Sequence, residues 1–198
     1  MATVYGFKQL SIRKLTNKLA PDTTAKIHVI KGAKTEGAPV TMEISGLSKE
    51  AQKVFGADIE YFSIRKGVGN VAANFGLLDL PTAVEQEILG YETLGEGIDG
   101  IGKETEAPFV AAFCESEDMQ GEPVAFAILA GTFSTDAYSL STKTDEDFTP
   151  EPGEYVLSAI SRKVTVEPSD EKEFHVLRAF GSTAVEKLRT IVLGTPLA

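Results

Sequence analysis

Three residues in this chain are of the types that most often act as nucleophiles, general bases or soft metal ligands: Cys114, His28 and His175. A zinc or copper site needs several such ligands, and the two histidines are far apart in the sequence. Each histidine lies inside a strand-like stretch, where a histidine is usually structural. Cys114 ends the apolar run 109–114, which indicates a buried, inert thiol. These residues therefore predict neither a metal centre nor a nucleophile–base pair.

Two short motifs invite a ligand interpretation. Residues 67–72, Gly-Val-Gly-Asn-Val-Ala, resemble a shortened dinucleotide fingerprint, which needs a following helix so that backbone amides face a pyrophosphate. A strand-like stretch follows instead, so a tight hairpin turn explains these glycines better. Asp145-Glu146-Asp147 groups carboxylates as calcium sites do, but it lacks the glycine and the distal glutamate of an EF-hand loop. We interpret it as a solvated acidic loop.

Other catalytic signatures do not occur in the sequence. There is no nucleophile elbow around a serine and no phosphate-binding loop that ends in Gly-Lys-Ser or Gly-Lys-Thr. With 29 acidic residues, two carboxylates could still meet in the folded chain, so an acid–base hydrolase stays open although no spacing favours it. We expect a protein that is not an enzyme and uses no cofactor.

The amino-acid composition indicates what kind of domain must position these residues. The 198 residues, 42% hydrophobic and 24% charged, suit one soluble domain over residues 1–198. No apolar run is long enough to cross a bilayer, and the first residues lack the features of a secretion signal. A single cysteine fits synthesis in a reducing cytoplasm. The net charge of -10 opposes phosphate binding, although acidity also serves solubility.

Strands should dominate the fold. Short apolar or β-branched stretches, several of them alternating with polar residues, are separated by Gly, Pro and Asp turns. This pattern favours a mainly β sandwich or barrel-like domain. The predicted strands cover residues 4–12, 26–30, 40–44, 59–65, 71–80, 108–115, 124–133, 155–166 and 173–180.

Helical signals are fewer. Residues 81–90 predict a helix in which Pro81 suits the first turn, Val84 and Ile88 share a face, and Gly90 ends the helix. A weaker helical signal covers residues 48–55. Residues 182–194 predict a C-terminal helix that starts with a capping box formed by Ser182 or Thr183 with Glu186. Its apolar stripe would contain Val185, Leu188, Ile191 and Val192.

Two stretches do not fit a core. Residues 90–107 are rich in glycine and acidic residues, and residues 142–153 contain acidic residues and two prolines. Loops of this length usually have a function or are mobile. We expect both stretches to be extended loops of a single domain.

Eight segments, in this order, carry a resemblance to a known family. They are Tyr5-Gly6-Phe7-Lys8 and residues 44–51, 66–69, 75–81, 88–91, 104–111, 129–134 and 187–194. Together they resemble the major tail proteins, or tail tube proteins, of bacteriophages with long, non-contractile tails, especially those that infect Gram-positive bacteria. The resemblance spans almost the whole chain.

The resemblance implies a β-sandwich or barrel-like subunit with a flanking α-helix and a short C-terminal helix. Such subunits form hexameric rings that stack into a hollow virion tube, synthesised in the host cytoplasm, through which DNA passes during ejection. The implied partners are copies of the chain itself, a tape-measure protein, a tail tip or baseplate, and a tail terminator. No membrane is implied.

A DNA conduit should have an acidic inner wall, because repeated contacts between basic side chains and phosphates would hold the genome. Glu43 and Glu60 lie on alternating strand-like stretches and are the candidate lumen-facing residues. Rival interpretations are a tail terminator, a baseplate hub subunit and a carbohydrate-binding β-sandwich. The last is disfavoured because the chain has no tryptophan and only five tyrosines for an aromatic platform.

Overall fold

Strands form most of the structure, a computed structural model that describes residues 3–95, 97–140, 142, 149–166 and 170–194. The two helices are α1 (Thr82–Leu89) and α2 (Ser182–Leu193). The strands are β1 (Val4–Lys14), β2 (Ile27–Ile30), β3 (Ala38–Ser45), β4 (Gln52–Gly56), β5 (Ile59–Ile64), β6 (Ala72–Leu78), β7 (Glu92–Gly95), β8 (Ile98–Gly100), β9 (Val110–Asp118), β10 (Pro123–Ser134), β11 (Gly153–Ala159), β12 (Arg162–Val166), β13 (Asp170–Phe174) and β14 (Val176–Phe180).

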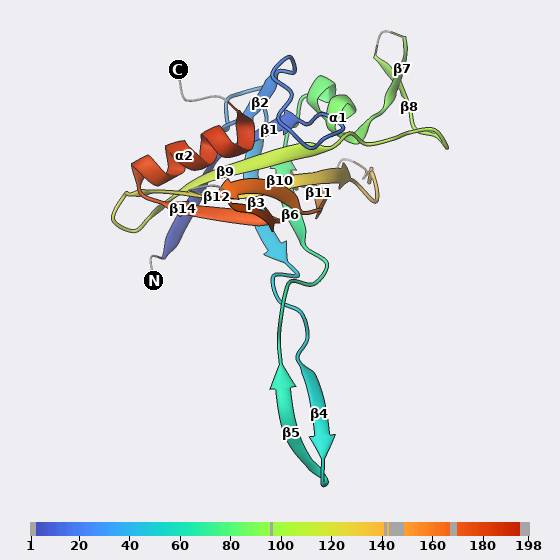
Figure 1. Ribbon diagram of the computed structural model, residues 1–198. Helices are drawn as coiled ribbons and strands as arrows, with labels where there is room; N and C mark the ends of the chain where they lie inside the picture. The colour runs from blue at the N-terminus through green and yellow to red at the C-terminus, as the bar shows by residue number, and fades with distance from the viewer. Residues whose placement is uncertain (1–2, 96, 141, 143–148, 167–169, 195–198) are drawn as a thin grey trace.

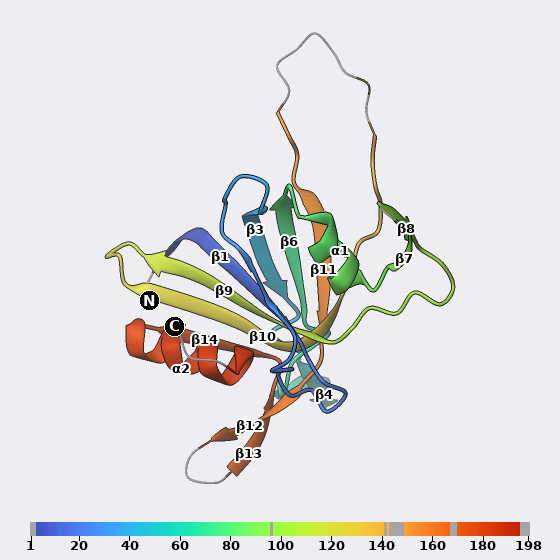
Figure 2. The same ribbon diagram turned by 90° about the horizontal axis from the view of Figure 1, so that it is seen from above.

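The main sheet is antiparallel and has the strand order β2-β1-β9-β10-β11-β6-β3, with β14 also paired to β10. The long strand β10 joins its two halves: residues 124–128 pair with β14 and residues 131–134 pair with β11. At this transition Gly131 passes so close to β11 that a Cβ would lie 2.5 Å from the Ser158 carbonyl oxygen. The two groups of strands cross at a steep angle (Figure 2). The sheet thus folds into two layers and does not close into a barrel.

Two hydrophobic clusters lie on opposite faces of β9 and β10. Val110, Ala112 and Cys114 of β9 pack between the two layers of the sheet. Ala111 and Phe113 alternate with them and pack under α2. Because both faces are covered, the first five residues of β9 are all buried. This explains why residues 109–114 read as a continuous apolar run.

The helix α1 confirms the sequence prediction for residues 81–90. Ile88 is 1% exposed and packs on the sheet. Gly90 ends the helix with a left-handed conformation (φ 71°). A Cβ at Gly90 would lie 2.0 Å from the Glu106 carbonyl oxygen, so no other residue fits at this position.

The C-terminal helix α2 is present, but its predicted capping box is wrong. The N-cap is Gly181, which turns the chain out of β14 with a φ of 85°, and no side chain caps the helix. Ser182 and Thr183 are therefore already inside the helix. Val185, Leu188 and Val192 are buried as predicted, whereas Ile191 is 40% exposed because it lies off that helical face.

Residues 47–68 are the largest departure from the sequence predictions, and we call this segment the arm. Residues 48–55 do not form the predicted helix, since β4 pairs there with β5. Together these strands form a hairpin that projects from one side of the body (Figure 1). Residues 67–72 are not a tight hairpin turn. They return the chain to β6, and the Gly69 amide donates to the Gly46 carbonyl oxygen at 2.8 Å.

Two other predicted strands are each divided in two. Residues 155–166 contain most of β11 and all of β12, and residues 173–180 contain the end of β13 and all of β14. The strands β12 and β13 leave the main sheet and pair with each other. Residues 90–107, predicted to be a loop, contain the small hairpin formed by β7 and β8. Half of the second predicted loop (142–153), residues 143–148, lies outside the described residues.

Candidate functional site

The residues whose side chains could take part in catalysis or metal binding lie in separate parts of the fold, where they have structural roles. The Nε2 atom of His28 on β2 is 2.8 Å from Oε2 of Glu87, so this pair ties β2 to α1. His175 lies between β13 and β14, and its carbonyl oxygen accepts the Leu129 amide at 3.0 Å. Cys114 is buried as predicted, and burial raises the pKa of its thiol well above the ordinary range. None of these three residues faces another of them across a site.

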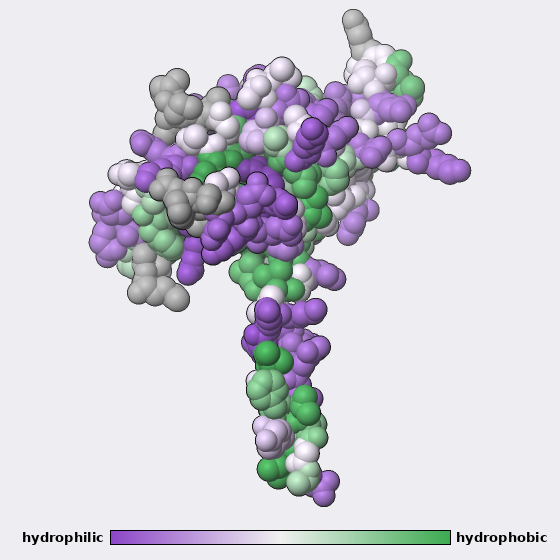
Figure 3. Space-filling view, viewed as in Figure 1, coloured by the Kyte–Doolittle hydropathy of each residue, from purple (hydrophilic) through white to green (hydrophobic). Residues whose placement is uncertain are grey.

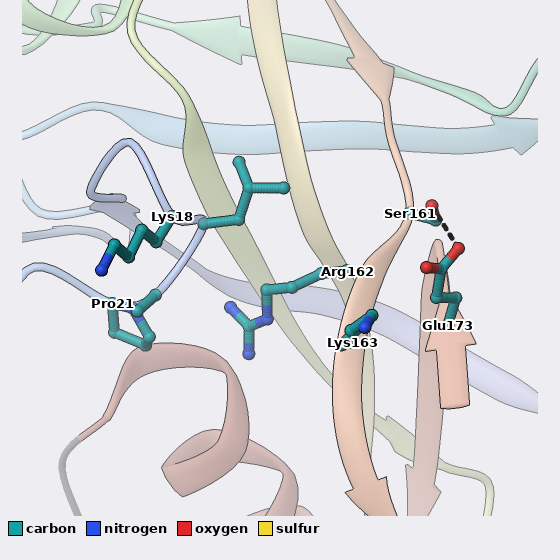
Figure 4. A pocket seen from close by; sticks show the side chains of 8 residues that line it. Lys18, Pro21, Ser161, Arg162, Lys163 and Glu173 are labelled. Carbon is teal, nitrogen blue, oxygen red and sulfur yellow. Dashed lines mark hydrogen bonds between the residues drawn. The ribbon is translucent and has the colours of Figure 1, made fainter. Parts of the chain in front are cut away.

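A cavity of about 440 Å³ lies beside the loop before β2 (Figure 4). Lys18, Pro21, Ser161, Arg162, Lys163 and Glu173 contribute to its wall. The Ser161 hydroxyl donates to Oε2 of Glu173 at 3.2 Å, and no histidine lines this cavity. Arg162 is occupied elsewhere, since its guanidinium donates to the Leu129 carbonyl oxygen at 3.1 Å. The cavity therefore contains no activated nucleophile.

Buried charges hold α2 against the sheet. Arg162 also donates to the Ile191 carbonyl oxygen, and Arg13 donates to that of Leu193. These carbonyls are at the end of α2, where the helix provides no amide partners and the macrodipole is negative. Burial lowers the pKa of Arg162. The two arginines are structural, because their donors are used by backbone oxygens.

A third arginine, largely buried and belonging to α2 itself, anchors the same helix to β9. Arg189 of α2 forms an ion pair with Glu115 of β9, and its guanidinium lies 5.0 Å from the centre of the Phe113 ring. Gln9 also donates to Glu115 at 3.1 Å. Glu115 is thus a partner for α2 and is not available as a general acid or base.

A cluster of tyrosines surrounds Glu85 of α1. Tyr138 and Tyr155 donate to Oε1 of Glu85 at 2.8 Å and 2.9 Å. The hydroxyl of Tyr91 lies 3.0 Å from that of Tyr138. Partial burial and the bond to Glu85 raise the pKa of Tyr155 above its ordinary value. The cluster fixes the chain after β10 onto α1, which is again a structural role.

No cation site emerges from the described residues. In that part of the chain, no three His, Cys, Asp or Glu side chains gather as a metal site requires. Asp145-Glu146-Asp147 lies outside it. Neither described helix is long and apolar enough to span a bilayer.

The structure places the two candidate lumen residues on different sheets. Glu43 is exposed on β3, the last strand of the main sheet. Glu60 lies on β5 of the arm, where its Oε2 is 2.8 Å from the Lys53 ammonium. The two carboxylates therefore do not share a strand face. Of the two, Glu60 forms an ion pair, whereas Glu43 forms none with the described residues.

Sequence reasoning missed the most prominent surface, which is the arm. Apolar side chains on both of its strands are exposed, and they stand out in Figure 3. The signal was present: residues 52–64 combine alternating apolar residues with a turn at Gly-Ala-Asp. What the sequence does not state is whether such a strand joins the main sheet or leaves it.

Comparison with known proteins identifies the family. A family model described as phage tail tube protein matches residues 7–151. No curated protein and no solved structure matches the chain. Because the family match covers well over half of the chain, this chain belongs to the phage tail tube protein family, whose members are structural, non-catalytic components of the virion.

Proposed function

We propose that this chain forms hexameric rings that stack into the tail tube, and that DNA passes through the lumen of this tube during ejection. The observation that carries the proposal is the open sheet. Among the described residues, β3 and β14 each pair with a neighbour on one side only. The first half of β1 likewise extends beyond its partner β2. Free edges of this kind pair with other chains unless they are covered.

A ring of identical copies would cover these edges. An edge such as β3 meets a different edge of the next copy, so the contact is heterologous, and heterologous contacts close into rings when the rotation permits. The lateral pairing would also join the open sheets of neighbouring copies around a central hole. The stretches 90–107 and 142–153 are further candidates for contacts between copies.

The charge of the chain supports the conduit role. With a net charge of -10, the chain as a whole repels phosphates more than it attracts them. Glu43 is our first candidate for the lumen wall, because it is exposed on β3. Glu60 is the weaker candidate, since Lys53 offsets its charge. From the family role we further propose contacts with a tape-measure protein, a tail tip or baseplate, and a tail terminator.

Electron microscopy of the purified, full-length protein tests the assembly directly. We expect tubes with a central hole and sixfold symmetry in cross-section at high protein concentration. Single rings that never stack would favour the tail terminator alternative. A monomer at every concentration and ionic strength would contradict both.

A further inference from the structure

We propose that residues 135–140, which we call the strap, have two states: in the major state the Tyr138 hydroxyl holds the strap on α1, and in a minor state it is released into solvent. The strap follows β10 directly. Tyr138 acts as a latch, and Glu85 of α1 is its fixed acceptor. The latch operates in the free subunit, so it does not depend on the proposed assembly of rings.

A single side chain attaches most of the strap to the body. The hydroxyl of Tyr138 donates to Oε1 of Glu85 at 2.8 Å and lies 3.0 Å from the hydroxyl of Tyr91. At the start of the strap, the Thr135 hydroxyl donates to the Glu154 carbonyl oxygen at 3.1 Å. Within the described part of the chain, the other residues of the strap make no hydrogen bond to the body. Loss of the Tyr138 contact would therefore free the strap beyond its first residue.

The acceptor stays in place when the strap leaves it. Oε1 of Glu85 also accepts the Tyr155 hydroxyl at 2.9 Å, from the strand β11 beside which α1 lies (Figure 2). Two residues further along α1, Glu87 is paired with His28 of β2. Ile88 is buried in the core. The helix is thus held by the sheet and by β2, independently of the strap.

The two tyrosines that share Glu85 differ in whether they can leave it. Tyr155 is 7% exposed and lies on a paired strand of the main sheet, so its hydroxyl cannot move away while β11 stays paired. Tyr138 is 60% exposed and lies in an irregular segment. After release, water would bond to the Tyr138 hydroxyl, and Tyr155 would still bond to Glu85. Because neither group is then buried without a partner, the cost of release is low.

This cost predicts the population of the released state. A hydrogen bond to a charged group contributes a net preference of roughly ten- to a hundredfold. The strap should therefore be released in about 1–10% of subunits, as is typical of a minor state that a ligand can make dominant. A contact that prefers the released strap needs only this difference in affinity to make it the major state.

Nitration of tyrosines in the folded subunit tests the latch. Tetranitromethane attacks the phenolate, and desolvation of the hydroxyl, with its bonds to Tyr91 and Glu85, raises the pKa of Tyr138 well above its ordinary value. Tyr5 and Tyr61 are exposed to a similar extent, 70% and 77%. We expect Tyr138 to be nitrated at least about tenfold more slowly than these two, because it must be released first. Mass spectrometry of the peptides gives each rate.

Substitutions of Glu85 separate the latch from exposure alone. Glu85→Ala removes the acceptor, so Tyr138 should be nitrated nearly as fast as Tyr5. Glu85→Gln keeps a neutral acceptor oxygen and should give an intermediate rate. The matched control is Glu87→Gln on the same helix, which should leave Tyr138 slow. Tyr155 should stay slow in every variant, because β11 keeps it buried, and so reports that the fold is intact.

A spin label on the strap measures the movement itself. Because Cys114 is buried, Leu140→Cys provides the reactive thiol of the folded chain. The electron paramagnetic resonance spectrum of the labelled subunit should contain a minor mobile component beside a less mobile one. Adding Tyr138→Phe should raise the mobile fraction at least about fivefold, because the latch is then lost. Adding Tyr61→Phe on the arm is the control and should leave the spectrum unchanged.

Different results would contradict different parts of the latch. Equal nitration of Tyr138 and Tyr5 in the unmodified subunit would show that the strap is not held in solution. A slow Tyr138 in Glu85→Ala would mean that Glu85 is not the acceptor that matters. An unchanged mobile fraction in Tyr138→Phe would overturn the two-state strap, also if Glu85→Ala exposes Tyr155 by unfolding. No measurement here requires rings or tubes, so failure of the latch leaves the proposed function standing, and the reverse holds as well.

Discussion

Arg162 and Arg13 are buried cations whose partners are backbone carbonyl oxygens at the end of α2, on β10 and in the loop before β2. Their role could not be predicted from the sequence, because Arg13 and Leu193 are at opposite ends of the chain. The burial of Cys114 could be predicted, since it depends only on a local apolar run. At the scale of residues, burial that depends on neighbouring residues could be predicted from the sequence, whereas a partner far along the chain could not.

The arginine contacts should contribute measurably to stability. Arg162→Met keeps much of the side-chain volume but leaves the Leu129 and Ile191 carbonyl oxygens without this donor. We expect the free energy of unfolding to fall by about 1–3 kcal/mol, measured from urea denaturation. The control is Lys163→Met, because Lys163 is an exposed neighbour whose ion pair with Glu171 should contribute little. Equal losses in the two variants would show that α2 does not depend on Arg162.

The thiol of Cys114 should be unreactive in the folded subunit. Burial raises its pKa, so the reactive thiolate is scarce and also inaccessible. We expect negligible labelling by a maleimide at neutral pH and complete labelling in concentrated urea, followed by mass spectrometry. Rapid labelling of the native subunit would mean that β9 is open to solvent at this position.

At the scale of elements, helices that have a buried face and a glycine stop could be predicted, as α1 shows. The signal over residues 48–55 misled because these residues have no buried helical face. Their pairing with β5 across a turn decides their conformation instead. The end of α2 was predicted correctly at Gly194, whereas its start depends on how Gly181 leaves β14. Element boundaries that depend on tertiary contacts could not be predicted from the local sequence.

The packing of α1 on the sheet gives a prediction at this scale. Ile88→Asp would bury an unpaired carboxylate in the main cluster, at a cost of about 3–5 kcal/mol. We expect a large fall in melting temperature or an insoluble subunit. Ala83→Asp, at an exposed position of the same helix, should melt close to the unmodified protein. An unchanged melting temperature for Ile88→Asp would show that α1 does not pack as the structure has it.

At the scale of the whole molecule, the mainly β fold and the family could be anticipated from the sequence. The open form of the sheet could not, because strand pairing depends on contacts far apart in the chain. The arm was missed for a related reason: its apolar alternation resembles that of a core strand, although its two strands pair only with each other and leave the main sheet. A pattern of alternating apolar residues does not say which strand, or which sheet, a segment joins.

The lumen gives the last prediction, which concerns the assembled tube. If Glu43 faces the channel, Glu43→Lys places a basic side chain at every subunit along the wall, and each phosphate contact adds to DNA affinity. We expect tubes of the unmodified protein not to retain duplex DNA at low salt. Glu43→Lys tubes should retain DNA that a nuclease does not digest, and retention should fall steeply as salt rises. Glu122→Lys, on the exposed turn before β10, serves as the control. Should both variants bind DNA that remains open to the nuclease, Glu43 would face the outside of the tube and another strand would line the channel.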